Sequence, residues 1–243
     1  MLKRLRGALA FLTLLPVGGG VLEEGELGGM VAMFPAVGLV LGALALAMAH
    51  VLSRVFPPWV GAALLLAFTV VLTGAFHLDG LADVFDALAL GRGRDALLTI
   101  MKESTVGVFG LSALVFDLMV KYGVMVFLLE ERLFYPLVVA PLVGRWSLVY
   151  LASRFPSARE KGLGALVVGV SRSGVLAWAS LWLLLLFFWE SRPFLLLLVV
   201  VPFLEGYGRF WKRRVGGVTG DILGGGCEMV EVLVYLVILW GRG

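Results

Sequence analysis

Long apolar runs dominate this sequence and limit the folds that it can adopt. Hydrophobic residues make up 60% of the 243 residues and charged residues only 15%, whereas an ordinary soluble domain carries about 25% charged residues. Several runs reach the roughly 20 residues that a helix needs to cross a bilayer. Since backbone polar groups in lipid must be satisfied internally, the sequence predicts an all-α, polytopic integral membrane protein. We expect residues 1–243 to form a single membrane-embedded domain.

About seven segments are apolar enough to be transmembrane helices. They are residues 30–52, 59–76, 107–129, 133–152, 174–189, 194–210 and 226–241. The opening MLKRLRGALAFLTLLPVGGG has basic residues followed by a short apolar run, as a signal peptide does, but it lacks an A-x-A cleavage pattern. We therefore expect an uncleaved N-terminal helix at the membrane interface.

Basic residues are unevenly divided between the two sides of this arrangement. The N-terminus and the connections 77–106, 153–173 and 209–225 fall on one side and carry most of the lysines and arginines. Cytoplasmic loops of membrane proteins are enriched in these residues. The pattern predicts a multi-pass protein of the cytoplasmic (cell inner) membrane, with its long polar connections in the cytoplasm.

A cluster of ionisable side chains lies in GAFHLDGLADVFDAL. Asp79, Asp83 and Asp86 are spaced i, i+4 and i+7, which places them on one face of a helix. Unpaired anions so close together repel one another, and carboxylate oxygens are preferred ligands of Mg²⁺ and Mn²⁺. We expect all three to bind Mg²⁺. The alternative is a solvated helix face, which the strongly apolar opposite face makes less attractive.

His77 lies two residues before Asp79. It could be a metal ligand, a general base, a partner of a ligand, or a structural residue. If the carboxylates bind metal, a histidine is suited to accept a proton near neutral pH. His77 and Asp86 are therefore the two candidate catalytic bases.

Phosphate-binding residue types follow in GRGRDALLTIMKESTVGVFG. Arginine binds phosphate in a planar, bidentate way and lysine acts as a point charge. We expect a polyphosphate substrate to contact Arg92, Lys102, Glu103 and Ser104. Each basic residue could instead anchor in lipid headgroups.

A second, glycine-rich cluster lies in GGVTGDILGGGCEMVE. Glycines let backbone N–H groups approach an anion closely, so Gly217, Thr219 and Gly220 are candidate phosphate contacts. Asp221 lies between two glycine groups and is a fourth candidate metal ligand. A flexible loop before a helix is the alternative. Glu228 and Glu231 lie at the expected cytoplasmic start of the last span, where carboxylates are usually functional.

Four more charges fall inside expected spans. Asp117 and Lys121 are spaced i, i+4 and could form an ion pair, while Arg145 and Glu205 could pair with other spans or line a cavity. An ion transporter could use such residues, but transporters of that kind have broken spans at matching positions, and we expect none here. An acidic metal site, basic residues and a glycine loop instead favour phosphoryl or phosphodiester transfer.

Several segments resemble the cobalamin synthase family of adenosylcobinamide-GDP ribazoletransferases, and the resemblance extends over nearly the whole chain. They are GAFHLDGLADVFDAL, GRGRDALLTIMKESTVGVFG, AREKGLGAL and GGVTGDILGGGCEMVE. The D-G-x-x-A-R pattern of the CDP-alcohol phosphotransferases, which also place aspartates on membrane helices, is missing after Asp79.

The resemblance implies the final assembly of the cobalamin lower loop. A ribose hydroxyl of α-ribazole, or of its 5′-phosphate, attacks the phosphorus of adenosylcobinamide-GDP nearest the cobinamide. GMP leaves, and adenosylcobalamin or its 5′-phosphate forms. The resemblance also implies Mg²⁺ as the cofactor. We expect membrane lipid as a partner and no nucleic acid, and the sequence leaves a homo-oligomer open.

Overall fold

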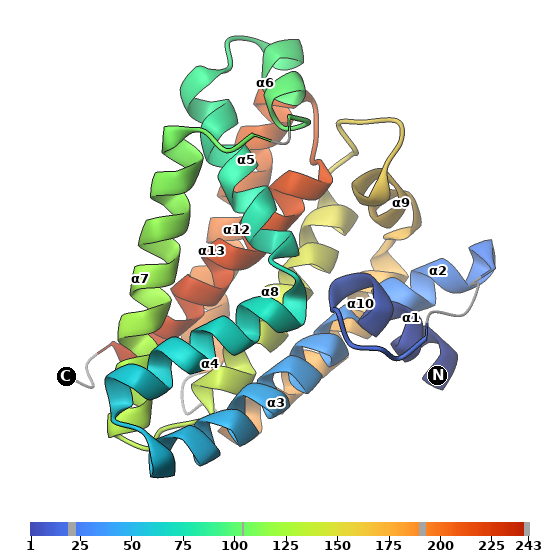
Figure 1. Ribbon diagram of the computed structural model, residues 1–243. Helices are drawn as coiled ribbons and strands as arrows, with labels where there is room; N and C mark the ends of the chain where they lie inside the picture. The colour runs from blue at the N-terminus through green and yellow to red at the C-terminus, as the bar shows by residue number, and fades with distance from the viewer. Residues whose placement is uncertain (19–22, 104, 190–192, 241–243) are drawn as a thin grey trace.

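A computed structural model describes residues 1–18, 23–103, 105–189 and 193–240 of the chain (Figure 1). All regular elements within these ranges are helices, so the predicted all-α class is confirmed. They are α1 (Leu2–Leu12), α2 (Glu24–Val31), α3 (Phe34–Val55), α4 (Pro58–Thr73), α5 (Phe76–Leu90), α6 (Arg94–Ile100), α7 (Val108–Glu130), α8 (Pro136–Arg154), α9 (Leu163–Val170), α10 (Ser173–Leu181), a 3₁₀ turn (Trp182–Leu185), α11 (Leu186–Trp189), α12 (Pro193–Val215) and α13 (Gly220–Leu239).

The helices provide between five and seven candidate membrane spans. In the described ranges, α3, α7, α8, α12 and α13 are each long and apolar enough to cross a bilayer. Two bent helix pairs bring the number to seven, which agrees with the count predicted from hydropathy. The pair α4–α5 is bent by 89°, and α9 is bent by 92° from the helical segment Ser173–Phe188.

These bends bear on two predictions. We expected no pair of broken spans at matching positions, and the structure has two helix pairs with the geometry of a broken span or a re-entrant loop. We also expected residues 77–106 to be a connection with the aspartates on a helix; that helix is α5, but together with α4 it has the geometry of a bent span. Gly74 and Ala75 both have left-handed backbone conformations, with φ of 60° and 57°. Such residues interrupt a right-handed helix, so the chain turns sharply between α4 and α5.

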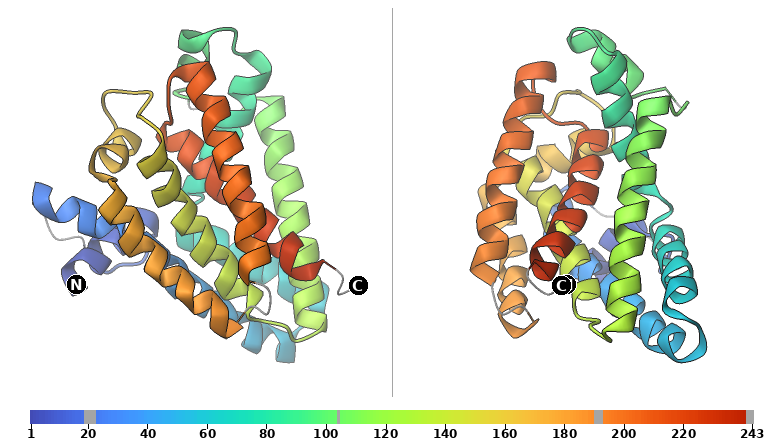
Figure 2. Two further views of the ribbon diagram at one scale, coloured as in Figure 1. Left: turned by 180° about the vertical axis from the view of Figure 1, so that it is seen from behind. Right: turned by 90° about the vertical axis from the view of Figure 1, so that its left-hand side faces the viewer.

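Helix α8 lies at the centre of the bundle and contacts both α3 and α13 (Figures 1 and 2). Glycines on α3 make the close packing possible. A Cβ atom on Gly38 would lie 2.2 Å from the carbonyl oxygen of Pro141, and one on Gly42 would lie 2.5 Å from Cα of Val138. Small residues at helix contacts are typical of membrane bundles, where tight packing replaces the hydrophobic effect.

The expected N-terminal helix is present as α1, and its buried residues pack against α3. Lys3 forms a 2.6 Å ion pair with Glu26 of α2. This hydrogen bond to Lys3 is the main reason that the pKa of Glu26 lies below its usual value. The interfacial position of α1 remains a prediction.

Several polar segments that are distant in the sequence meet at one end of the bundle, at the top of Figure 1. They are the turn between α5 and α6, the loop 155–162 and the turn between α12 and α13. Backbone hydrogen bonds join Ala158 and Pro156 to Val218, and Nε of Arg94 donates to the carbonyl of Val215 at 3.0 Å. We refer to this region as the polar end. It contains the candidate site.

Candidate active site

Glycines bring α5 and α13 into backbone contact at the polar end. A Cβ atom on Gly80 would lie 2.8 Å from the carbonyl oxygen of Asp221, and one on Gly224 would lie 3.3 Å from Cα of His77. Side chains at these positions would push the helices apart. The close approach therefore brings the aspartates of α5 beside Asp221 at the start of α13.

A cavity of about 200 Å³ lies where α5, α13 and the loop before α9 meet. Its polar and glycine lining includes Asp79, Arg159, Lys161, Gly164, Thr219 and Asp221. Nη1 of Arg159 lies 3.1 Å from Oδ2 of Asp221, and the Thr219 hydroxyl lies 3.2 Å from the same oxygen. The Thr219 oxygen also accepts the backbone N–H of Ile222 and so caps α13. Asp221 is therefore held in place at the cavity wall.

Asp79 and Asp83 have no such partners. Asp79 is exposed and Asp83 is half-buried. Within the described part of the chain, neither side chain forms a hydrogen bond or ion pair. Asp83 also lies within electrostatic range of Asp79, Asp86 and Asp221, with Arg159 as the opposing charge. Negative charge at this point is thus only partly compensated by the protein.

These side chains match the oxygen-ligand chemistry of Mg²⁺, but the structure does not gather them into a ready metal site. No group of three or more His, Cys, Asp or Glu side chains in the described ranges lies where it could hold a metal ion. Magnesium usually takes only one or two protein carboxylates and fills its octahedral shell with water and substrate phosphate oxygens. Asp79 and Asp221 line the open cavity and carry oxygen atoms of the right type, whereas Asp83 lies one helical turn from Asp79 and is not part of the lining.

Asp86 has a different environment from the other aspartates. It is only 4% exposed, and its carboxylate accepts the backbone N–H groups of Gly107 at 2.6 Å and Gly110 at 2.8 Å. These donors lie at the start of α7, where N–H groups lack helical partners. A Cβ atom on either glycine would lie within 2.5 Å of the Asp86 carboxylate. This geometry favours a role in positioning α7 over a role as metal ligand or base.

His77 is separated from the aspartates. It is buried and faces α13, and its side chain lines a second, mostly apolar cavity. It is not among the residues that line the cavity of Asp79 and Asp221. Because His77 and Asp79 are close in the sequence, we expected a histidine base beside the aspartate ligands. The structure does not place them together in one cavity.

The expected phosphate contacts also divide into two groups. Thr219 and Gly220 line the cavity. Gly217 instead lies against the loop 155–162, since a Cβ atom there would lie 2.0 Å from the carbonyl oxygen of Pro156. Arg92, Lys102 and Glu103 are exposed and do not line the cavity, while Ser104 lies outside the described residues.

Sequence reasoning missed Arg159, Lys161 and Gly164 as site residues. A Cβ atom on Gly164 would lie 2.3 Å from the backbone nitrogen of Gly220, so this glycine lets α9 approach the start of α13. The available signal was AREKGLGAL, a segment with two basic residues and two glycines in a polar connection.

Comparison with known proteins identifies the family. Residues 4–239 match the family described as cobalamin-5-phosphate synthase. The chain belongs to this family. It is 36% identical over 252 residues to adenosylcobinamide-GDP ribazoletransferase of Geotalea daltonii, with the full length of both chains covered. It is 39% identical over 253 residues to the protein of the same name from Klebsiella pneumoniae, covering 98% of this chain and all of the relative. No solved structure matches the chain at a significant level.

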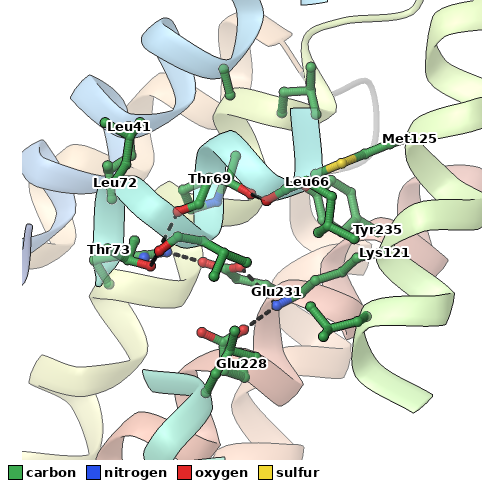
Figure 3. Close-up of a pocket in the computed structure, with 17 residues that line it drawn as sticks. Leu41, Leu66, Thr69, Leu72, Thr73, Lys121, Met125, Glu228, Glu231 and Tyr235 are labelled. Atoms are coloured by element: carbon green, nitrogen blue, oxygen red, sulfur yellow. Dashed lines mark hydrogen bonds and ion pairs between the residues drawn. The ribbon is translucent and has the colours of Figure 1, made fainter. Parts of the chain in front are cut away.

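This member of the cobalamin synthase family also contains a buried ionic network inside the bundle (Figure 3). Lys121 of α7 pairs with Glu228 of α13 and lies 3.1 Å from Asp117 and 3.3 Å from Glu231. Glu231 also pairs with Arg145 of α8. Of these side chains, all but Asp117 border a cavity of about 50 Å³, which is large enough for a few water molecules.

The ion pairs bear on the alternatives that the sequence left open, and for Arg145 both hold, because it pairs with another span and also lines a cavity. Asp117 pairs with Lys121, Arg145 pairs with another span, and Glu205 forms ion pairs with Arg154 and Arg209. Because α13 begins at Gly220 rather than 226, Glu228 lies inside the bundle and not at the start of the last span, as we had expected.

Proposed function

We propose that this chain is an adenosylcobinamide-GDP ribazoletransferase. It would join adenosylcobinamide-GDP to α-ribazole or α-ribazole 5′-phosphate, and it would release GMP with adenosylcobalamin or its 5′-phosphate. Family membership supports this activity. The observation that carries the mechanism is the cavity at the polar end, where Asp79 and Asp221 lie beside Arg159 and Lys161.

Asp79 and Asp221, which line this cavity, would hold Mg²⁺, and Asp83, one helical turn from Asp79, would move in as a further ligand when the metal binds. Bound there, Mg²⁺ would neutralise the negative charge of the substrate diphosphate and of the departing phosphate. Support comes from the oxygen donors and from the uncompensated charge of Asp79 and Asp83. Asp86 is omitted from this ligand set because both of its oxygens accept backbone N–H groups.

Three features of the cavity would bind and orient the diphosphate. Arg159 and Lys161 provide positive charge, and the N-terminus of α13 provides backbone N–H groups and the positive end of a helix dipole. Glycines 164 and 220 add no side chains at that N-terminus, where Thr219 already accepts the N–H of Ile222. Arg92 and Lys102, which are exposed at the same end, would attract the anionic substrate before it binds.

The ribose hydroxyl must lose a proton as it attacks. His77 lines a different cavity, and Asp86 already accepts two N–H groups. We therefore assign this proton transfer to neither of the two bases predicted from the sequence.

The polar end would face the cytoplasm, where nucleotide and Mg²⁺ are available. The basic connections predicted to be cytoplasmic meet at this end. The apolar surfaces of α3, α7 and α12 would contact membrane lipid.

The activity can be tested with purified protein. Adenosylcobinamide-GDP mixed with α-ribazole should release GMP, and omission of Mg²⁺ should abolish the release. Asp79→Asn and Asp83→Asn should each lose this Mg²⁺-dependent turnover. Asp95→Asn is a matched control, since Asp95 is an exposed acid on α6 that does not line the cavity. Full turnover by both α5 variants would refute the ligand assignment.

A further inference from the structure

A second cavity lies directly beside the cavity of Asp79, between α1, α3, α5, α9 and α13. Its lining is almost entirely apolar and includes Phe11, Phe34, Phe76, Val167 and Leu223, together with His77. We refer to it as the aromatic cavity. The ring of Phe11 stacks on that of Phe34 at 5.7 Å, and Phe76 meets the edge of Phe11 at 6.4 Å.

His77 is the polar side chain of the aromatic cavity, and it lacks a partner. It is only 2% exposed, and neither Nδ1 nor Nε2 forms a hydrogen bond within the described part of the chain. A buried polar group without a hydrogen bond is costly and rare in folded proteins. An unsatisfied imidazole in the wall of a cavity therefore points to a ligand that supplies the missing hydrogen bond.

The two cavities share part of their walls. Phe76, Leu163, Gly164 and Gly220 border both of them. The backbones of Gly164 and Gly220 pack closely against each other, so a passage between the cavities runs past the side chains of Phe76 and Leu163. One occupant could thus place an apolar ring beside His77 and a sugar hydroxyl beside Asp79.

We propose that the aromatic cavity binds the flat nitrogen-containing base of the nucleoside acceptor, and that His77 forms a hydrogen bond with a ring nitrogen. This proposal rests on the proposed function and specifies where its second substrate binds. Aromatic side chains suit a flat ring because offset and edge-to-face contacts are favourable. A lipid acyl chain would fit the apolar lining but would leave His77 unsatisfied.

Entry of the base requires a movement of Phe76. The aromatic cavity has a free volume of only about 30 Å³, which is too little for a fused ring. Phe76 is 43% exposed and borders both cavities, and turning outward would exchange its contacts with Phe11 and His77 for contacts of the base with the same two rings. The base then takes the place of the Phe76 ring against Phe11 and His77.

The first test uses the histidines themselves. The chain has two histidines, His50 and His77. His50 is exposed, packs against Phe134 and does not line the aromatic cavity, so it serves as the control. Protein with ¹⁵N-labelled histidine should give two sets of imidazole signals, assigned with a His50→Gln variant. Addition of benzimidazole alone should shift the His77 signals and leave those of His50 unchanged. An unchanged His77 signal, or equal shifts of both, would overturn the proposal.

This test needs neither Mg²⁺ nor turnover, so it separates the two proposals. A His77 shift in protein that releases no GMP would refute the proposed function and retain the base site. Normal GMP release without a His77 shift would refute the base site and retain the proposed function.

A kinetic test separates binding by His77 from base catalysis. His77→Phe keeps an aromatic ring but removes the hydrogen bond. We expect it to raise KM for α-ribazole about 10-fold, while kcat and KM for adenosylcobinamide-GDP change little. A fall in kcat at unchanged KM, with a flattened pH–rate profile, would identify His77 as a base and overturn the assignment.

Neighbouring valines on α9 provide a matched pair. Val167 lines the aromatic cavity, whereas Val168 does not. Val167→Phe should fill the cavity and raise KM for α-ribazole, and Val168→Phe should leave that KM unchanged. Equal effects of the two substitutions would contradict the location of the base. If Val167→Phe fails to fold, the response of the His77 signals to benzimidazole in the unmodified protein still tests the proposed base site.

Discussion

Helix α13 contributes acidic residues to two clusters that differ in how their charge is balanced. At the polar end, Asp221 lies near Asp79 and Asp83, with Arg159 as the paired cation and a cavity beside them. In the middle of the bundle, Glu228 and Glu231 are paired with Lys121 and Arg145. One cluster has unpaired carboxylates next to a cavity, and the other is paired across three helices.

The difference follows from the surroundings of each cluster. Charges inside a membrane bundle are costly unless they are paired, so the interior network must neutralise most of its own charge. At the polar end, water and dissolved cations can balance excess carboxylates. Negative charge that the protein leaves unbalanced there is available for a metal ion, which in turn would attract an anionic substrate. From this comparison we propose a structural role for the interior cluster and a chemical role for the end cluster.

The largest effect on stability is expected for Lys121→Met. The substitution leaves Asp117, Glu228 and Glu231 with Arg145 as their remaining partner, and breaking a buried ion pair costs about 3–5 kcal/mol. Unfolding of the detergent-solubilised protein by denaturant would measure the loss. Lys3→Met, which removes an exposed pair, should not change the unfolding midpoint. The comparison fails if the two variants are equally stable. Adding Glu228→Gln to Lys121→Met should restore part of the stability.

The end cluster should show the opposite behaviour. Asp79→Asn with Asp83→Asn should reduce Mg²⁺-dependent GMP release on the order of 100-fold or more, because the oxygen donors for Mg²⁺ are lost. The melting temperature should stay the same or rise, since repulsion between carboxylates is removed. A large fall in melting temperature would show that these residues are structural, like those of the interior network.

Asp86 should behave as a structural residue although it lies on the same helix face as Asp79. Asp86→Ala removes two hydrogen bonds at the start of α7 and should lower the free energy of unfolding by about 2 kcal/mol. The Mg²⁺ concentration that gives half-maximal turnover should not change in the remaining folded protein. A strong rise in that concentration would return Asp86 to the set of metal ligands.

The smallest effect is expected for Arg159→Lys. Arg159 donates to Asp221 and to the carbonyl of Leu98, and a lysine cannot reproduce this two-sided geometry. KM for adenosylcobinamide-GDP should rise about fivefold, which corresponds to ~1 kcal/mol. Arg92→Lys is the control with no expected change at high salt. An unchanged KM for Arg159→Lys would place the diphosphate elsewhere.

Local sequence patterns were enough to predict the helical class, the approximate number of spans and the acidic face of α5. Hydropathy and helical periodicity depend on residues that are near one another in the chain. The 3.6-residue repeat placed Asp79, Asp83 and Asp86 on one face, and that face exists. The break at Gly74 and Ala75 was not predicted, because an alanine in the left-handed conformation has no sequence signal of its own.

The functions of individual site residues depended on contacts that are distant in sequence. Asp86 was grouped with its neighbours because its partners, Gly107 and Gly110, lie on another helix. Arg159 was missed because its interaction with Asp221 spans 62 residues. Spacing within α5 could not show that His77 lines a different cavity from Asp79, since that depends on the packing of α13.

The most direct measurement is binding of Mn²⁺, used as a paramagnetic substitute for Mg²⁺. Electron paramagnetic resonance would count bound Mn²⁺ on purified protein with adenosylcobinamide-GDP and no acceptor. Unmodified protein and Asp95→Asn should bind Mn²⁺, and Asp79→Asn with Asp83→Asn should not. Undiminished Mn²⁺ binding by the double variant would contradict the assignment of the unbalanced carboxylates at the polar end to a metal site.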